Sequence, residues 1–228
     1  MNLLSCVLIG TIITVGITAV MTGLSIYVEP IGAVSRTNGF QLSALAMIIS
    51  SMILLIAGMF YPRNAILRRS AFLLMFVGIT GALMAATQLI QSKTLVLVTL
   101  LSVVAILSIL LFVGIYDLVD MSQSFPALFS ILIVVIIASV LNIVIFKSDW
   151  IGTTISAGSI ILFSLFVIWD IQYVKKGYGV VLKKTVSNGT SRWVPDKIGA
   201  CEAGVMNIWL DFANILMSAM DLLQGNQK

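Results

Sequence analysis

The chain has 228 residues, of which 60% are hydrophobic and only 10% are charged, with a formal net charge of +4. This composition excludes a soluble globular protein and predicts an all-α integral membrane protein whose helices lie in the lipid bilayer. Histidine is absent, which removes the commonest transition-metal ligand and the usual pH switch near neutrality. The small positive charge reflects membrane topology, so no nucleic-acid partner is expected.

Seven apolar stretches follow one another along the chain, each about long enough to cross roughly 30 Å of hydrocarbon. We expect spanning helices over 4–27, 41–60, 70–90, 95–116, 127–146, 151–174 and 198–223. The first stretch has no basic segment before it, so we interpret it as a spanning helix and not as a signal peptide. These helices occupy nearly all of residues 1–228, which predicts a single seven-helix transmembrane domain with one long loop, at 175–199.

Basic residues collect in two of the connections. Nine of the thirteen lie between the second and third helices or between the sixth and seventh, namely Arg63, Arg68, Arg69, Lys175, Lys176, Lys183, Lys184, Arg192 and Lys197. The positive-inside rule places these two connections and the N-terminus in the cytosol, and the C-terminus on the other side.

Two aspartates stand inside otherwise apolar helices, Asp170 in the sixth and Asp211 in the seventh. A charge at the centre of a membrane helix costs roughly 2.5–3.5 kcal/mol, so such residues usually face a partner or a cavity. Both helices meet the cytosol through the same loop, and we expect the two carboxyl groups to approach each other near the cytosolic third of the bundle. The alternative for Asp170 is that it merely reaches water at the helix end, where Lys175 and Lys176 follow.

A polar stripe runs along the seventh helix. Spacings of four, three, four and three place five residues on one face: Asn207, Asp211, Asn214, Ser218 and Asp221. Because lipid cannot satisfy polar groups, we expect this stripe to line a central polar space. The alternative for the asparagines and the serine is hydrogen bonding between helices without any part in conduction. Asp221, near the far end, either attracts ions or is simply interfacial.

When two buried carboxyl groups are in contact, ionising both of them has a high free-energy cost. They therefore share a proton and titrate as a coupled unit. Such a pair can hold two helices together and loosen as it ionises, which predicts gating and pH sensing by Asp170 and Asp211. Carboxylate oxygens also suit Ca²⁺, so the same pair is a candidate calcium site.

Intramembrane aspartyl proteases also carry two aspartates on consecutive helices. That family has a Gly-x-Gly-Asp motif and a later Pro-Ala-Leu, whereas Ile208–Trp209–Leu210 precede Asp211 here and no Pro-Ala-Leu follows. We therefore expect no catalytic residues, no enzymatic activity and no cofactor, with Ca²⁺ only as a permeating or bound ion.

The segments SAGSIILFSLFVIWDIQYVKKG and NIWLDFANILMSAMDLL resemble the Bax inhibitor-1 family, also called the transmembrane BAX inhibitor motif family. The matching residues of the sixth helix are Phe163, Ser164, Trp169, Asp170 and Gln172, and those of the seventh are Trp209, Leu210, Asp211, Phe212 and Asn214. Tryptophan replaces the usual tyrosine in both helices.

This resemblance implies a bundle in which the seventh helix is surrounded by the other six, and a pH-sensitive calcium leak regulated by Asp170 and Asp211. It implies the cytoplasmic membrane of a bacterium, or an ER, Golgi or related internal membrane in a eukaryote or its viruses, where the family is tied to cell-death suppression. Members can carry charged residues in the second helix that lock the gate. Here that helix has none, so Arg63 at its cytosolic end is the candidate gate lock.

Two functions therefore remain open from the sequence: a calcium leak channel, and a non-conducting regulator that binds other membrane proteins through its exposed helices. The polar stripe favours conduction, because a pure scaffold does not need one. The sign of the pH response is also open. Ionisation could open the gate by repulsion, or create a cation site that blocks it.

Overall fold

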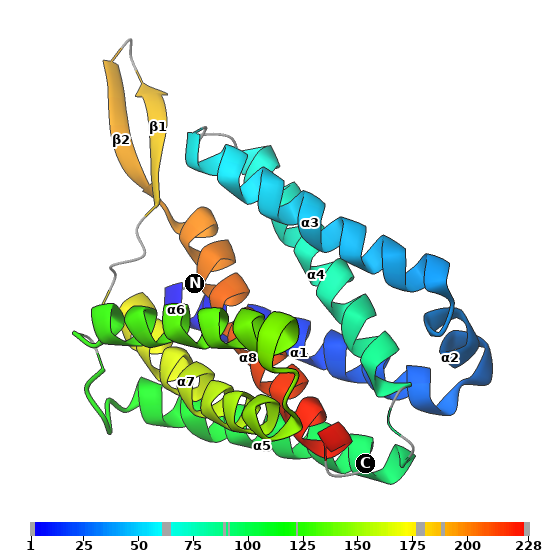
Figure 1. Ribbon diagram of the computed structural model, residues 1–228. Helices are drawn as coiled ribbons and strands as arrows, with labels where there is room; N and C mark the ends of the chain where they lie inside the picture. The colour runs from blue at the N-terminus through cyan, green and yellow to red at the C-terminus, as the bar shows by residue number, and fades with distance from the viewer. Residues whose placement is uncertain are drawn as a thin grey trace. The chain divides into compact units, whose positions relative to one another are not determined.

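The computed structural model describes residues 3–60, 65–88, 90, 92–121, 123–176, 181–187 and 190–225. Within these ranges it describes all side chains except those of residues 55–68, 181–198 and 224–225. The described elements are, in chain order, α1 (Leu3–Tyr27), α2 (Glu29–Ser35), α3 (Asn38–Phe60), α4 (Ala65–Thr87), α5 (Lys93–Ile115), α6 (Phe125–Leu141), a π-helical turn (Asn142–Phe146), α7 (Asp149–Lys175), β1 (Val181–Ser187), β2 (Thr190–Asp196) and α8 (Lys197–Gly225) (Figure 1).

Six of the described helices are long and apolar enough to cross a membrane: Leu3–Tyr27, Arg69–Thr87, Lys93–Ile115, Phe125–Phe146, Asp149–Lys175 and Gly199–Leu223. The bent pair Glu29–Ser35 and Asn38–Leu54, which meet at 66°, raises this to as many as seven. The predicted helical membrane bundle is therefore confirmed. The most apolar 18-residue window of the span in α8 is 56% buried, against 6% for that of α6.

Two connections contain structure where the sequence predicts a loop or a turn. The 175–199 connection holds β1 and β2, which pair antiparallel with Ser187 opposite Thr190. Asn188 and Gly189 separate the strands in the sequence, and Asn-Gly favours tight hairpins. Residues 29–35 form α2, because a proline fits the first turn of a helix, where its missing N–H has no partner to lose.

The chain divides into two compact units. The first comprises Met1–Val15, Ser92–Gly179 and Ala203–Lys228, and the second comprises Gly16–Gln91 and Val180–Glu202.

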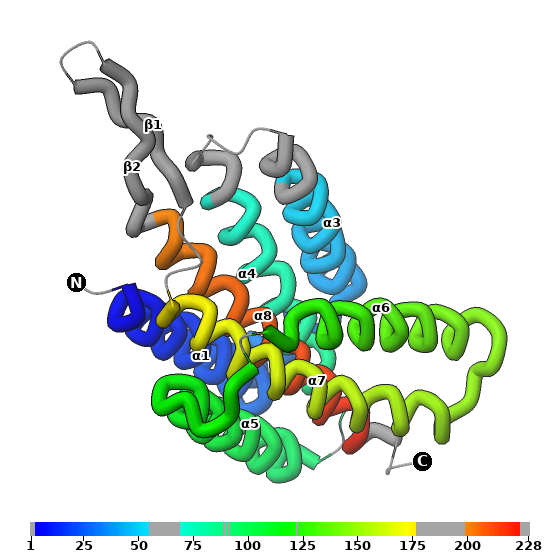
Figure 2. Tube along the Cα trace, turned by 90° about the vertical axis from the view of Figure 1, so that its left-hand side faces the viewer, coloured from blue at the N-terminus to red at the C-terminus, as the bar shows by residue number. Residues whose placement is uncertain are grey.

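In the first unit, α7 lies between α5 and α6 (Figure 2). Gly114 lets α5 approach closely, since a Cβ at this position would lie 3.0 Å from the side chain of Ile171 on α7. On the other side, Leu128 of α6 packs against Leu162 and Phe166 of α7 in a small apolar cluster. These contacts fix the position of the helix that carries Asp170.

In the second unit, α4 packs against α3 and the later part of α1. Gly78 of α4 approaches α3 so closely that a Cβ would lie 3.0 Å from the carbonyl oxygen of Ala44. Hydroxyl groups pair between α1 and α4, with Ser25 and Thr87 joined at 3.2 Å. Small residues and hydroxyl pairs are the usual means of holding helices together in lipid, where apolar burial drives little association.

Candidate functional site

Asp170 on α7 and Asp211 on α8 lie together in the first unit. Their carboxyl groups lie close enough to interact directly. Both residues are nearly buried, at 5% and 7% exposed. A carboxyl oxygen can donate only when it is protonated, so a direct hydrogen bond between the two groups requires a proton on at least one of them.

One amide side chain donates a hydrogen bond to the aspartate pair. Asn207, one turn before Asp211 on α8, donates from Nδ2 to Oδ1 of Asp170 at 3.3 Å. Oδ2 of Asp211 is buried and has no hydrogen-bond partner among the described residues. The pair is thus a carboxyl site with few polar contacts, which is an environment that favours the neutral or half-neutralised state over two free charges.

The two lysines that follow Asp170 are bound elsewhere. Lys175 forms an ion pair with Asp117, and Lys176 lies 3.4 Å from Asp120. Both acidic partners belong to the connection between α5 and α6. Asp170 itself faces α8, which is not the arrangement expected of a side chain that reaches toward water at a helix end.

The polar stripe of α8 is graded in exposure. Asn207 and Asp221 at its two ends are exposed, Asp211 is buried, and Asn214 and Ser218 are half-buried. Nδ2 of Asn214 donates to the carbonyl oxygen of Leu210 on its own helix, at 2.9 Å. This bond lies within α8, whereas the bond from Asn207 to Asp170 joins α8 to α7, as the alternative of interhelical hydrogen bonding expects.

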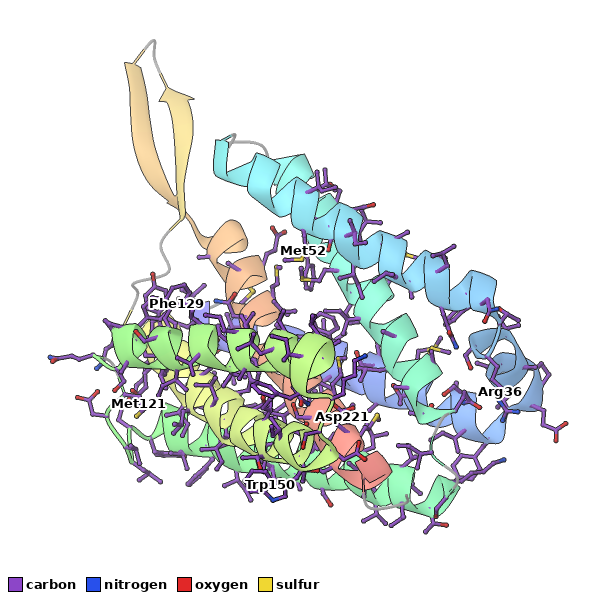
Figure 3. The ribbon with its side chains drawn as sticks, in the orientation of Figure 1. Arg36, Met52, Met121, Phe129, Trp150 and Asp221 are labelled. Atoms are coloured by element: carbon purple, nitrogen blue, oxygen red, sulfur yellow. The ribbon has the colours of Figure 1, made fainter. Side chains whose placement is uncertain are left out.

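The far end of the stripe also meets α7. Asp221 lies beside Ser156, which is buried on α7, and both residues line the same pocket. Figure 3 shows Asp221 and Met121 near opposite ends of α7. Because Asp170 meets residues 207 and 211 while Ser156 meets residue 221, α7 and α8 run antiparallel along a shared polar face. We call this face the α7–α8 seam; it contains Asp170, Ser159 and Ser156 of α7 and the stripe of α8.

A pocket of about 400 Å³ lies at the Asp221 end of the seam. It is lined by polar and charged residues from α7, α8, the π-helical turn and the connection that follows it, among them Asn142, Lys147, Ser148, Asp149, Thr153, Ser156 and Asp221. Two hydrogen bonds, at 3.1 and 3.2 Å, join the side chain of Asn142 to the backbone of Ser148 and hold the turn that lines this pocket. The sequence singles out Asp221 of this pocket but not its other lining residues, because the π-helical turn and the connection after it have no marked pattern.

Calcium usually takes six to eight oxygen ligands. Asp170 and Asp211 offer carboxylate oxygens from two residues, and no cluster of three or more aspartate, glutamate, cysteine or histidine residues lies within the described ranges. A calcium ion at this pair would therefore need further oxygen ligands from backbone carbonyl groups or water.

The candidate gate lock, Arg63, lies outside the described residues. In the second unit, Nε of Arg69 donates to Oε1 of Glu202 at 2.7 Å and so ties the start of α4 to the start of α8. Nothing in the sequence separates Arg69 from the other basic residues of this connection, because its partner lies 133 residues away in the chain.

Comparison with known proteins gives two matches. The family model described as "Inhibitor of apoptosis-promoting Bax1" matches residues 2–228. The chain is also 29% identical over 107 residues to the "Uncharacterized protein Cj0236c" of Campylobacter jejuni, a match that covers 46% of this chain and 37% of that protein.

Proposed function

The chain belongs to the Bax inhibitor-1 family, and from that premise we propose that it is a calcium leak channel whose opening depends on the protonation of Asp170 and Asp211. The observation that carries this proposal is that two buried carboxyl groups, one on α7 and one on α8, lie close enough to interact, beside an amide of α8 that donates to Asp170. With one shared proton, the pair holds the two helices together.

Loss of the shared proton changes the sign of this interaction. Two unit charges about 4 Å apart repel by about 4 kcal/mol at an effective dielectric constant of 20. That exceeds the roughly 0.6–2 kcal/mol of a hydrogen bond between membrane helices. Because Asn207 is the only other polar side chain described in contact with the pair, no basic group offsets the repulsion. We therefore expect α7 and α8 to separate at this level as pH rises.

The ion would follow the α7–α8 seam. Asp170 and Ser156 are fourteen residues apart on one helix, which corresponds to about 21 Å of rise. This is roughly two-thirds of the hydrocarbon thickness. The remaining distance falls at the ends, where the seam meets the pocket that contains Asp221. Its hydroxyl, amide and carboxylate oxygens are the ligand types that Ca²⁺ accepts.

Calcium flux into liposomes containing the purified protein tests the proposal. We expect a protein-dependent flux that rises between about pH 5 and pH 8, the range in which a coupled buried carboxyl pair can titrate. Asp170→Asn and Asp211→Asn should each flatten this pH profile, because neither variant can carry two negative charges at the site. Glu29→Gln, which changes an exposed carboxylate on α2, is the matched control and should leave the profile unchanged.

Other outcomes have definite meanings. A flux that falls as pH rises would show that the ionised pair holds a cation and blocks the pathway. A folded protein with no flux above that of empty liposomes would exclude the channel and favour the non-conducting regulator, for which the exposed apolar surface of α6 is the available docking face.

We further propose that the aspartate pair performs no hydrolysis. Ile208 and Trp209, which precede Asp211, are fully buried and leave little access for a substrate peptide and water beside the carboxyl groups. Incubation with membrane-spanning peptides should therefore yield no cleavage products at any pH at which the flux responds.

A further inference from the structure

Gln172 lies two residues after Asp170, and its side chain is fully buried. Both ends of its amide are engaged by the backbone of one segment. Nε2 donates to the carbonyl oxygen of Val119 at 2.6 Å, and Oε1 accepts from the N–H of Met121 at 2.8 Å. This segment, residues 116–124, connects α5 to α6, and we call it the α5–α6 connection.

Two lysines at the end of α7 hold the same segment. Nζ of Lys175 donates to the carbonyl oxygen of Ile115, the last residue of α5, at 2.7 Å, and also pairs with Asp117. Nζ of Lys176 lies 3.4 Å from Oδ1 of Asp120. Exposed ion pairs contribute little by themselves, whereas a buried amide left without partners is costly. Gln172 is therefore the strongest of these contacts.

Aromatic side chains of α7 also pack against the start of α6. The ring of Trp169 lies 4.7 Å from that of Phe125, the first residue of α6, and 4.8 Å from that of Tyr173. Trp169, Gln172, Tyr173 and Lys176 follow steps of three, one and three, so they share one face of α7. Asp170 and Val174 lie on another face, where a Cβ on Gly204 of α8 would lie 3.0 Å from Val174.

From this arrangement we propose that Gln172 is a positioning residue of the aspartate gate. It fastens the α5–α6 connection to the last turns of α7 and so keeps Asp170 in register with Asp211. The gate is the one proposed above, but the position of Asp170 can be measured without any flux. The groups described as facing Asp170 are Asp211 and Asn207 of α8, and the charges of the α5–α6 connection, Asp117 and Asp120, are paired with Lys175 and Lys176.

The consequence of losing Gln172 follows from its position. Without the amide, the α5–α6 connection separates from α7, and water gains access to the carboxyl pair from that end. Water stabilises the charged form of a carboxyl group. The shared proton should then be lost at lower pH than in the wild type.

Infrared spectroscopy of the reconstituted protein reads this proton directly, through the carbonyl stretch of a protonated carboxyl group. The band from the pair is assigned by its loss in Asp170→Asn and Asp211→Asn. In Gln172→Leu we expect the midpoint of the band's disappearance to move by about one pH unit toward acid, a tenfold change in the ionisation equilibrium. Gln41→Leu replaces an exposed glutamine on α3 and should leave the midpoint unchanged.

Gln172→Glu provides a second variant that tests the hydrogen-bonding pattern itself. A protonated glutamic acid can donate to Val119 and accept from Met121, but an ionised one can only accept. This variant should match the wild type in acid and resemble Gln172→Leu once the new carboxyl group ionises. Lys175→Met, which keeps Gln172, should give a smaller shift and remains available if Gln172→Leu does not fold.

A folded Gln172→Leu protein with the wild-type midpoint would overturn the inference, as would the absence of a protonated carboxyl band in the wild type. If the band shifts as expected but no liposome shows calcium flux, the positioning role stands and the channel proposal falls. If Asp170→Asn and Asp211→Asn alter the flux while Gln172→Leu changes neither the flux profile nor the band, the channel proposal stands and the positioning role falls.

Discussion

At the scale of single residues, Asn214 separates the two roles that a polar group in a membrane helix can have. Its amide donates to Leu210 of the same helix. If the stripe conducts, Asn214→Leu should lower the calcium flux because it removes a polar group from the α7–α8 seam. Stability should change by no more than about 0.5 kcal/mol, since the described amide bond holds no second helix.

Thermal unfolding in detergent and flux in liposomes, measured on the same preparation, check this expectation. A variant that unfolds several degrees earlier and conducts normally would assign Asn214 to helix association. Ser43→Ala, which changes an exposed hydroxyl bonded to its own helix on α3, serves as the control for both measurements.

The pairing of the two aspartates could be predicted from the sequence, because a charge inside an apolar membrane helix is stable only beside a partner or in a polar cavity. Asp170 and Asp211 are each such a charge, and the structure brings them together. Gln172 could not be assigned a partner in the same way. An amide near a helix end is satisfied by many arrangements, and its partners here are backbone groups, which leave no signature in the sequence.

At the scale of helices and strands, two glycines give a matched test of how α8 is held. A Cβ on Gly204 would lie 2.8 Å from Val7 of α1 and 3.0 Å from Val174 of α7, whereas nothing lies within 4 Å of a Cβ on Gly158. Gly204→Ala should therefore destabilise the protein by about 1–3 kcal/mol through overpacking. Gly158→Ala should be neutral or stabilise it by up to about 1 kcal/mol, because alanine favours a helix.

The free energy of unfolding in mixed micelles, measured by denaturant titration for both variants, decides the matter. Equal effects of the two substitutions would mean that α8 does not approach α1 and α7 as closely as described. The two variants are matched, since both glycines lie within helices and both substitutions add one methyl group.

The spanning helices were accessible from the sequence, while the smaller elements were not, for a physical reason. A spanning helix must be apolar for about 20 residues, so its signal is long and hard to imitate. The helix α2 has seven residues, and the hairpin of β1 and β2 has seven in each strand. Segments this short are decided by turn geometry and by contacts with the rest of the fold, which override weak local preferences.

At the scale of the whole molecule, the distribution of charge makes a testable statement about orientation. Gln123 lies in the α5–α6 connection and Trp150 at the start of α7, and both are exposed. Between them the span Phe125–Phe146 has 22 residues, a length of about 33 Å, which is enough to cross the hydrocarbon. The two positions must then lie on opposite sides of the membrane.

The positive-inside rule assigns Gln123 to the cytosol, on the same side as Lys175 and Lys176, and the contacts of these lysines with Asp117 and Asp120 agree with that placement. In intact cells, a membrane-impermeant thiol reagent should therefore label Trp150→Cys, and should label Gln123→Cys only after permeabilisation, with the parent protein as the background control. The opposite pattern would invert the topology and place the aspartate pair near the non-cytosolic face, where it would sense a different pH. Labelling of both positions from one side would remove α6 from the set of spanning helices.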